Sequence, residues 1–281
     1  ELALAEAGVD RSVATMRDDV DPTSVEFVLM WNLSAEQLTT YGNLRGVLMG
    51  GAGFDHLDLA AMPEVPFVRL IDPGMARDIA SYVLAWTIHF QRDFDHFAVA
   101  ASERTWMADP PPRFAREVTV GVLGLGAIGE VVREVCDGHG FATLGWSRSN
   151  HDRSLVEFFA DSDVVVNLVP LSAATRGVVG SSELTALDDG VLINVGRGPT
   201  VDTEALLAAL DDRLRAAVLD VFDAEPLPSD SPLWGRSDVI VTPHVAGRSD
   251  PVTAAPVVAA SVVELLAGRT PVATIPRSTV G

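Results

Sequence analysis

Three polar residues of types suited to acid–base chemistry each follow a short apolar segment. Arg197 follows GVLINVG, Glu225 comes shortly after AAVLDVF, and His244 ends VIVTPH. An arginine can hold a carboxylate through two parallel hydrogen bonds, and a histidine can give or take a proton near neutral pH. A nearby glutamate favours the protonated imidazole and fixes its orientation. Each residue alone also has a plainer interpretation, such as a satisfied core histidine or a solvated loop glutamate, so the prediction rests on their common placement.

A glycine-rich turn elsewhere in the chain has the pattern of a nucleotide-binding site. The motif GLGAIG directly follows the apolar segment VTVGVL and precedes a helical pattern, which is the context of a dinucleotide-binding turn. Gly124 permits the tight turn, Gly126 lets a pyrophosphate approach the backbone, and Gly129 allows close packing of the helix on the strand. We expect the free N–H groups of Ala127 and Ile128 to bind the phosphates. The alternative is a glycine turn in a core that binds no ligand.

The end of the following strand favours NADP(H) over NAD(H). Ser147 stands where an NAD-binding domain usually carries an acidic residue for the ribose 2′-hydroxyl, and Arg148 follows it. A guanidinium can pair with a 2′-phosphate. We therefore predict NADP(H) as the preferred cofactor, with NAD(H) as an alternative if Arg148 is only a solvated surface residue. A nicotinamide hydride, a carboxylate-binding arginine and a proton-donating histidine together suit the reduction of a 2-keto acid.

Alternating strands and helices must position these residues. Buried strands and helices take turns from 118 to 244, which predicts a doubly wound parallel sheet whose strand ends share one ligand-binding edge. Two further apolar segments, VEFVLMW and LRGVLMG, flank a helix that Ser34 begins, with Gln37 at the capping-box position. Residues 78–106 lack Gly and Pro and are predicted to form one long helix, and residues 257–266 a last one.

Composition narrows the class of protein further. A chain of 281 residues is long enough for two domains. Its 39 acidic residues face 20 basic ones, all arginine, and the formal charge of −19 argues against nucleic-acid binding. One cysteine, Cys136, and six histidines show no zinc-ligand spacing, so we expect no metal site and a reducing cytoplasm. No signal peptide is visible, and no apolar run reaches the roughly 18 residues that cross a bilayer, so no membrane contact is expected.

Six motifs in a fixed order then make the chain resemble a known family, the D-isomer-specific 2-hydroxyacid dehydrogenases. Within that family it is most similar to the glyoxylate and hydroxypyruvate reductases, because of DPGMARD, WSRS and SPLW. The family motifs are GAGFDHL at 51–57, GLGAIG at 124–129, LVPLSAATRGVV at 168–179, INVGRG at 193–198, LDVFDAEPLP at 219–228 and TPHVAG at 242–247.

The resemblance implies two Rossmann-like doubly wound α/β domains. Residues 78–251 would form the nucleotide-binding domain, inserted into a substrate domain made of residues 1–77 and 252–281, with the active site in the cleft and a homodimer formed through the long helix. It implies that Arg197 binds the carboxylate and carbonyl of the substrate. It also implies that Glu225 pairs with His244, the acid/base.

The resemblance also implies roles for further residues of the site. Asp220 matches the position that contacts the nicotinamide carboxamide, and the backbone amides of Ala52 and Gly53 match those that hold the substrate carboxylate. Trp31 either lines the substrate pocket or is a core residue. The alternative for the loop that contains Ala52 is a glycine turn that binds no ligand. The residues expected to border the cofactor elsewhere are Pro170, Thr175 and Val195.

The chain departs from the family pattern at its N-terminal end, and two other functions are also compatible with its motifs. Only the tail of the family's first strand and helix is visible, so either the substrate domain lacks that strand or the strand lies in residues outside this sequence. One rival is an NAD(P)-sensing, corepressor-like binding protein that keeps Arg197, Glu225 and His244. Another is a formate or phosphite dehydrogenase of the same fold. Loss of NADPH absorbance on addition of a keto acid would favour the reductase over the sensor.

Overall fold

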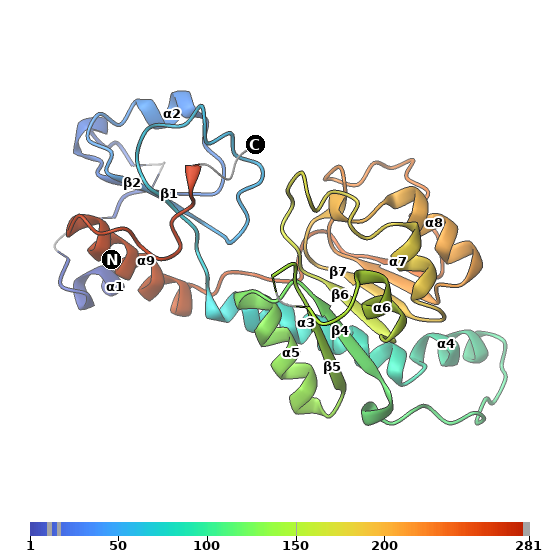
Figure 1. Ribbon diagram of the computed structural model, residues 1–281. Helices are drawn as coiled ribbons and strands as arrows, with labels where there is room; N and C mark the ends of the chain where they lie inside the picture. The colour runs from blue at the N-terminus through green and yellow to red at the C-terminus, as the bar shows by residue number, and fades with distance from the viewer. Residues whose placement is uncertain (10–12, 16–17, 150, 278–281) are drawn as a thin grey trace. The chain divides into compact units, whose positions relative to one another are not determined.

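The chain folds into two compact units, one of which is inserted into the other in sequence. The computed structural model describes residues 1–9, 13–15, 18–149 and 151–277 (Figure 1). Residues 76–248 form the inserted unit, and residues 1–75 with 249–281 form the other. The predicted fold class, two parallel-sheet α/β units with one inserted into a discontinuous second one, is confirmed.

A six-stranded parallel sheet forms the centre of the inserted unit. The strand order is β5-β4-β6-β7-β8-β9, so the chain moves outward from β4 to β5 and then returns to the other side of β4. In open α/β sheets, ligands bind beyond the carboxyl ends of the strands where the order reverses, which here is next to β4. The strands are β4 (Thr119–Leu123), β5 (Ala142–Trp146), β6 (Val164–Asn167), β7 (Val191–Asn194), β8 (Ala216–Leu219) and β9 (Val239–Val241).

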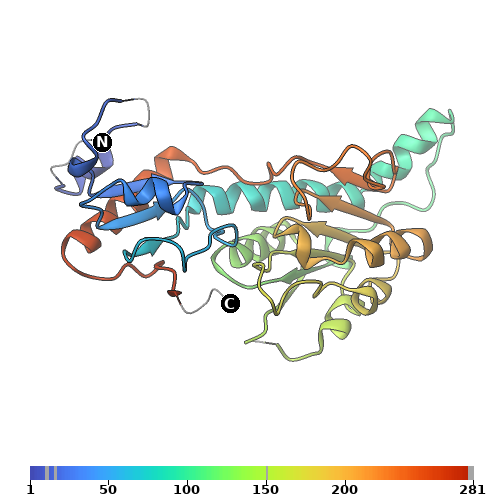
Figure 2. The same ribbon diagram turned by 90° about the horizontal axis from the view of Figure 1, so that it is seen from above.

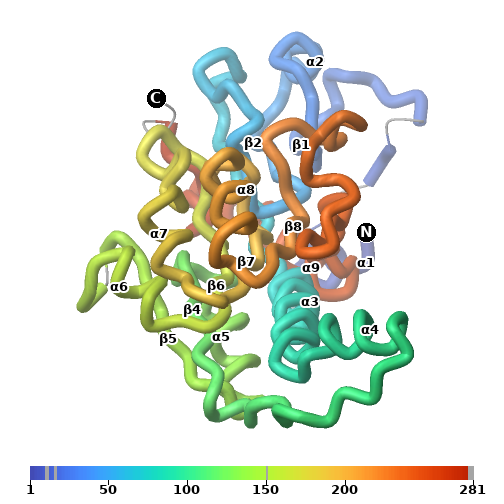
Figure 3. Tube along the Cα trace, turned by 90° about the vertical axis from the view of Figure 1, so that its right-hand side faces the viewer, coloured from blue at the N-terminus to red at the C-terminus, as the bar shows by residue number. Residues whose placement is uncertain are grey.

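Helices cover both faces of this sheet, as a doubly wound fold requires. Figure 3 shows α6, α7 and α8 on one face and α3 and α5 on the other. The central strands are buried along their whole length, so they consist almost entirely of apolar residues. The helices are α3 (Pro73–Gln91), α4 (Phe94–Ser102), α5 (Ala127–His139), α6 (Leu155–Ala160), α7 (Ser181–Ala186) and α8 (Thr203–Asp212), with short 3₁₀ turns η2 (Ala115–Glu117) and η3 (Gly198–Thr200).

The prediction of one long helix over 78–106 is wrong, because two helices lie there (Figure 2). Asp93 adopts a left-handed conformation, with a φ of 55°, and ends the regular helix geometry between α3 and α4. The Arg215 guanidinium, 122 residues further along the chain, binds Asp93 at 2.8 Å and also Asp95 at 2.7 Å. Two carboxylates gathered on one half-buried cation favour the break over a continuous helix.

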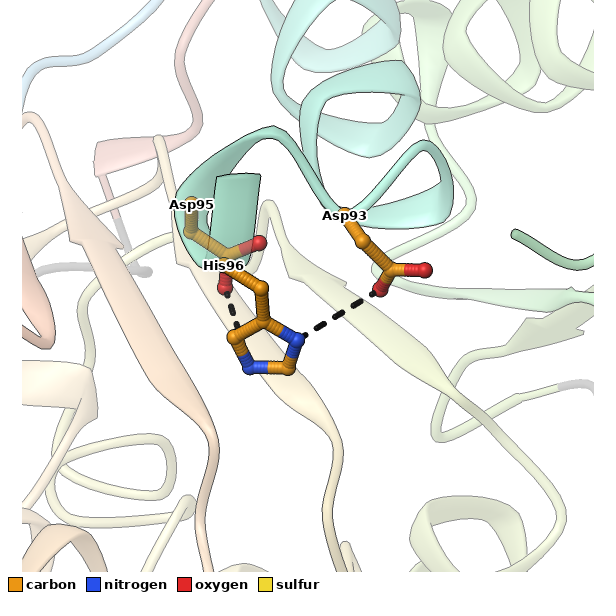
Figure 4. Close-up of side chains that lie close together, drawn as sticks. All are labelled: Asp93, Asp95 and His96. Carbon is orange, nitrogen blue, oxygen red and sulfur yellow. Dashed lines mark ion pairs between the residues drawn. The ribbon is translucent and has the colours of Figure 1, made fainter. Parts of the chain in front are cut away.

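His96 joins these two carboxylates in a small cluster (Figure 4). Its ring nitrogens lie 3.9 Å from Asp93 Oδ1 and 3.9 Å from Asp95 Oδ2. Such a group has donor atoms of the kinds that bind metal ions. Because Arg215 already supplies the positive charge that both carboxylates need, we interpret the cluster as an ion-pair network.

A three-stranded parallel sheet forms the centre of the other unit, in the order β1-β2-β3. The predicted capping box is confirmed, since the Gln37 amide donates to Ser34 Oγ and the Ser34 amide to Gln37 Oε1. The final helix starts six residues before the predicted position 257, because Asp250 caps it and Pro251 suits its first turn. The elements are β1 (Phe27–Met30), β2 (Gly46–Met49), β3 (Phe67–Val68), α1 (Leu2–Glu6), α2 (Ala35–Thr39), α9 (Pro251–Leu266) and the 3₁₀ turn η1 (Pro22–Ser24).

Asp72 connects two distant parts of this unit through its buried carboxylate. It accepts hydrogen bonds from the amides of Gly74, Met75 and Asp250 and from the Thr253 hydroxyl. Burial by itself would raise the pKa of Asp72, but these four donors together lower it. The carboxylate therefore caps the start of α3 and joins it to the start of α9.

An Asp72→Ala variant is expected to be less stable by about 2–3 kcal/mol at neutral pH, because hydrogen bonds to a charged group are lost. The pKa of Asp72 is lower in the folded chain than in the unfolded one. Its contribution is therefore complete above the unfolded pKa, near 4, and disappears as the pH falls through the folded value. Urea midpoints of both proteins at pH 7 and at lower pH measure this, and a difference that grows on acidification would contradict the account.

Two further features of the fold bear on function. Burial raises the pKa of the Cys136 thiol to about 11, which makes this thiol a poor nucleophile, so Cys136 is a small buried side chain of the core. Among the described residues, no helix is both long and apolar enough to cross a membrane.

Candidate active site

The three predicted catalytic residues follow three neighbouring strands. Asn194, Leu219 and Val241 are paired in register at the carboxyl ends of β7, β8 and β9. Arg197, Glu225 and His244 lie in the loops that leave these three ends. The sheet order therefore brings the three loops to one edge, as the sequence predicts.

His244 and Glu225 are in direct contact. Nδ1 of His244 lies 2.7 Å from Glu225 Oε2, and the other oxygen of Glu225 accepts the Phe222 amide at 3.0 Å. A carboxylate has no proton to give, so Nδ1 of His244 carries the hydrogen of this bond. Nε2 is then the nitrogen that can exchange a proton with a substrate. The imidazole remains 44 % exposed, so a ligand can reach it.

The backbone at His244 is held in an uncommon conformation. Its φ of 54° lies in the left-handed region, which few residues other than glycine adopt. The His244 amide donates to the Asp220 carbonyl at 2.9 Å. The Asp220 carboxylate, only 2 % exposed, accepts the amides of Val245 and Ala246, both at 2.9 Å. Asp220 therefore fixes the loop that presents His244.

Asp220 thus has a role that the sequence did not reveal. The expected contact with a nicotinamide carboxamide stays a prediction, because both carboxylate oxygens already accept hydrogen bonds from the chain.

A buried polar network supports Arg197 in the same way. The Arg197 carbonyl accepts the Thr200 hydroxyl at 2.6 Å and the Asn194 side-chain amide at 3.3 Å. Asn167 donates to both Asn194 and Thr200. Because polar groups buried without partners are costly, this closed network gives the Arg197 loop one well-defined conformation.

The Arg197 loop also packs tightly on the loop of Glu225. A Cβ added at Gly198 would lie 2.0 Å from the Phe222 carbonyl carbon, so only glycine fits there. Since the Phe222 amide binds Glu225, this close approach joins the Arg197 and Glu225 loops.

In the glycine turn, the packing and backbone conformation of the protein require glycine at two positions but not at a third. Gly124 has a φ of 107°, and a Cβ at Gly129 would lie 2.1 Å from the Gly124 oxygen, so both positions require glycine. A Cβ at Gly126 would meet no described heavy atom within 4 Å. Gly126 is also the N-cap of α5 and offers no side-chain acceptor to the amides of the first turn. The open space and the unpaired amides of this turn fit a bound phosphate.

A Gly126→Val variant is expected to fold normally and to bind NADPH about tenfold more weakly or worse, because the side chain would fill the space in front of the amides. The backbone at Gly126 is extended, with a φ of −121°, so valine fits it without strain. Fluorescence titration with NADPH measures the loss. An unchanged affinity would place the cofactor elsewhere.

Arg148 lies just after the end of β5. It is exposed, and it forms no ion pair within the described part of the chain. Arg153, five residues further along the chain, pairs with Asp152 at 2.9 Å and Asp161 at 2.6 Å. These two carboxylates already neutralise the charge of Arg153. Ser147, just after β5, uses its carbonyl to accept His151 at 2.9 Å.

The remaining cofactor candidates lie after β6 and β7. The Thr175 hydroxyl donates to the Pro170 carbonyl at 2.6 Å and accepts the Ser172 amide at 2.8 Å, and the residue is buried. Thr175 therefore shapes this loop from within, while Pro170 is exposed on it. Val195 is buried, and its amide donates to the Asn167 carbonyl.

The substrate candidates of the other unit also share a sheet edge. Trp31 follows β1, and Ala52 and Gly53 follow β2 in a loop. A Cβ at Gly51 would lie 2.5 Å from the Trp31 ring, so the indole packs directly on the start of this loop. Trp31 is 53 % exposed and stacks on His56, so it is a surface residue rather than core.

Comparison with known proteins identifies the family. The family model described as "D-isomer specific 2-hydroxyacid dehydrogenase, NAD binding domain" matches residues 84–246, more than half of the chain. The chain belongs to the D-isomer specific 2-hydroxyacid dehydrogenase family. The predicted resemblance is thereby confirmed.

Relatives within this dehydrogenase family are similar over most of the chain. Glyoxylate/hydroxypyruvate reductase A from Citrobacter koseri is 35% identical over 268 residues, covering 88% of this chain and 85% of the relative. The protein of that name from Salmonella typhimurium is 34% identical with the same coverage.

Two solved dehydrogenase structures share the fold over nearly the whole chain. The Xanthobacter autotrophicus Py2 D-isomer specific 2-hydroxyacid dehydrogenase, in complex with NADPH and MES, has a TM-score of 0.88 and 37% identity, covering 99% of this chain and 93% of that one. The Sinorhizobium meliloti NADPH-dependent glyoxylate/hydroxypyruvate reductase, in complex with NADP and sulfate, has a TM-score of 0.87 and 30% identity, covering 99% and 94%.

Several residues that support the dehydrogenase site were missed by sequence reasoning. Asn167 and Asn194 hold the loop of Arg197, and Tyr82 and Thr242 contact one another beside Asp220. The two asparagines carry a readable signal, because each is a polar residue that ends a buried strand, in VVVN and VLIN.

Proposed function

We propose that the chain is an NADPH-dependent reductase that converts a small 2-keto acid, of the glyoxylate or hydroxypyruvate type, to the D-2-hydroxy acid. The observation that carries this proposal is the 2.7 Å bond between His244 Nδ1 and Glu225, which leaves Nε2 as the proton donor. The names of the relatives and the NADPH dependence of the Sinorhizobium meliloti enzyme support it. The same names do not favour a corepressor or a formate or phosphite dehydrogenase.

The residues of the site divide the work between them. Arg197 binds the substrate carboxylate and holds the keto group in line, which lowers the barrier by orientation. His244 donates the proton of Nε2 to the carbonyl oxygen, and Glu225 stabilises the imidazolium beforehand. The cofactor, when bound, supplies the hydride.

Two parts of the chain are proposed to hold NADPH. The amides of Ala127 and Ile128, next to the open space at Gly126, bind the pyrophosphate. Arg148 pairs with the 2′-phosphate beside Ser147, which carries no charge to repel it. Pro170 and Val195 border the cofactor, with Thr175 shaping the loop. The formal charge of −19 makes such local cations necessary for binding two anionic ligands.

Arg148→Ser is expected to lower kcat/KM for NADPH by about 10- to 100-fold, because a charge-assisted pair is lost. The value for NADH should change little, since NADH has no 2′-phosphate. Initial rates with both cofactors, measured side by side on the wild type and the variant, test this. Equal efficiency of the wild type with both cofactors would contradict the preference.

Substrate contacts in the other unit and a homodimer complete the proposal. Ala52, Gly53 and Trp31 are proposed to contact the substrate, on the basis of their shared sheet edge. A homodimer is supported by large apolar side chains exposed on α4 and just after it, among them Val99 and Trp106, the latter 95 % exposed. Light scattering should give twice the chain mass of 29.8 kDa. A cytoplasmic location stays a prediction.

The test of the function is a panel of 2-keto acids with NADPH, followed at 340 nm. We expect turnover with glyoxylate and hydroxypyruvate. Tight NADPH binding without turnover of any acid would favour the sensor instead.

A further inference from the structure

A hydrogen-bonded chain leads from helix α3 to the loop of His244. The Tyr82 hydroxyl lies 2.7 Å from Thr242 Oγ1, 160 residues further along the sequence. Thr242 Oγ1 in turn lies 2.6 Å from Asp220 Oδ1. All three residues belong to the inserted unit. Tyr82 is one of only two tyrosines in the chain.

The direction of each bond follows from counting protons. A threonine hydroxyl has one hydrogen, and Thr242 donates it to the Asp220 carboxylate. The Tyr82 hydroxyl must therefore be the donor to Thr242. Burial, reinforced by the charge of Asp220, raises the pKa of Tyr82, so its hydroxyl keeps this proton at neutral and mildly alkaline pH.

The series of hydrogen bonds from Tyr82 ends at the Asp220 carboxylate, which shapes the His244 loop. Asp220 Oδ1 accepts both the Thr242 hydroxyl and the Val245 amide, while Oδ2 accepts the Ala246 amide. These hydrogen bonds prevent the carboxylate group of Asp220 from rotating. They thereby maintain the left-handed backbone of His244, a conformation that persists only when its surroundings determine it.

We propose that Tyr82 is a positioning residue for His244, acting through Thr242 and Asp220. The proposal rests on the proposed reductase function and adds to it a residue on α3, outside the strand-end loops. Without the Tyr82 hydroxyl, the Thr242 hydroxyl can turn away from Asp220, and the loop samples conformations in which His244 is misplaced. The imidazole would then be in place for a smaller fraction of the time.

Tyr82→Phe tests this with little disturbance, because the ring that packs edge-on to Trp86 is retained. Loss of one hydrogen bond should lower kcat by about 3- to 10-fold and leave the KM for the keto acid within about twofold. Amide exchange at Val245 and Ala246, followed by NMR, should accelerate by a similar factor. Tyr41→Phe, which changes the other tyrosine, is the matched control and should alter neither quantity.

A second variant keeps the proposal testable if the first has a general effect on folding. Thr242→Val removes the hydroxyl that links Tyr82 to Asp220. Adding Tyr82→Phe to this variant should lower kcat no further, since both changes interrupt the same series of hydrogen bonds. Additive losses, or faster exchange that extends equally to the amides of β6, would overturn the proposal. So would an unchanged exchange rate at Val245 and Ala246. The exchange measurement uses no substrate, so it tests positioning even if the wild type reduces no keto acid.

Discussion

His244→Asn is expected to lose a factor of about 10² to 10⁴ in kcat, the range typical for removal of a general acid. Asparagine is the suitable replacement because it tolerates the left-handed backbone that His244 adopts, so the loop should keep its shape. Steady-state rates of NADPH oxidation with glyoxylate or hydroxypyruvate measure the loss.

The control for this variant is cofactor binding, which should be unchanged because His244 is not proposed to touch the phosphates. Glu225→Gln should lie between the wild type and His244→Asn in kcat, since the imidazole would keep a hydrogen-bonding partner but lose the charge-assisted bond that orients it. Wild-type turnover in His244→Asn would remove His244 from the mechanism.

Gly198→Ala is expected to have the largest effect on folding. The new Cβ would overlap the backbone of Phe222 at 2.0 Å, and backbone atoms cannot move aside as a flexible side chain can. We expect a loss of about 3 kcal/mol or more, which corresponds to a thermal midpoint lower by about 6–12 °C. Any folded protein should also lose activity, because Phe222 holds Glu225.

Gly138→Ala provides a matched glycine substitution. Gly138 lies in α5, and its added Cβ would meet no described atom within 4 Å. Because alanine favours helix, this variant should be unchanged or more stable by up to about 1 kcal/mol. Thermal unfolding of the two variants compares them directly, and equal midpoints would show that the Gly198 contact is not tight.

Local patterns predicted the elements that carry the chemistry. The alternation of buried strands and helices predicted the parallel sheet, which has six strands. The positions of Arg197, Glu225 and His244 just after strand ends could be predicted from the local sequence alone. Gly126 could be read as well, because the motif around it is short and continuous. These features depend on residues close together in sequence.

Features that depend on distant partners could not be predicted. The break between α3 and α4 results from Arg215, which is 120 residues from Asp95, and nothing near Asp93 in the sequence indicates it. Tyr82 occupies a helical pattern in which an aromatic residue suggests core packing, and its partner Thr242 is 160 residues away. The position of Asp220 was identified, whereas its hydrogen bonds to the His244 loop became visible only in three dimensions.

Chiral analysis of the product is the most direct test of whether the protein reduces a 2-keto acid to the D-hydroxy acid. The wild-type protein is incubated with NADPH and hydroxypyruvate, and the glycerate formed is separated on a chiral column. We expect D-glycerate in an amount equal to the NADPH oxidised. L-glycerate, a racemic product, or no oxidation of NADPH would contradict it.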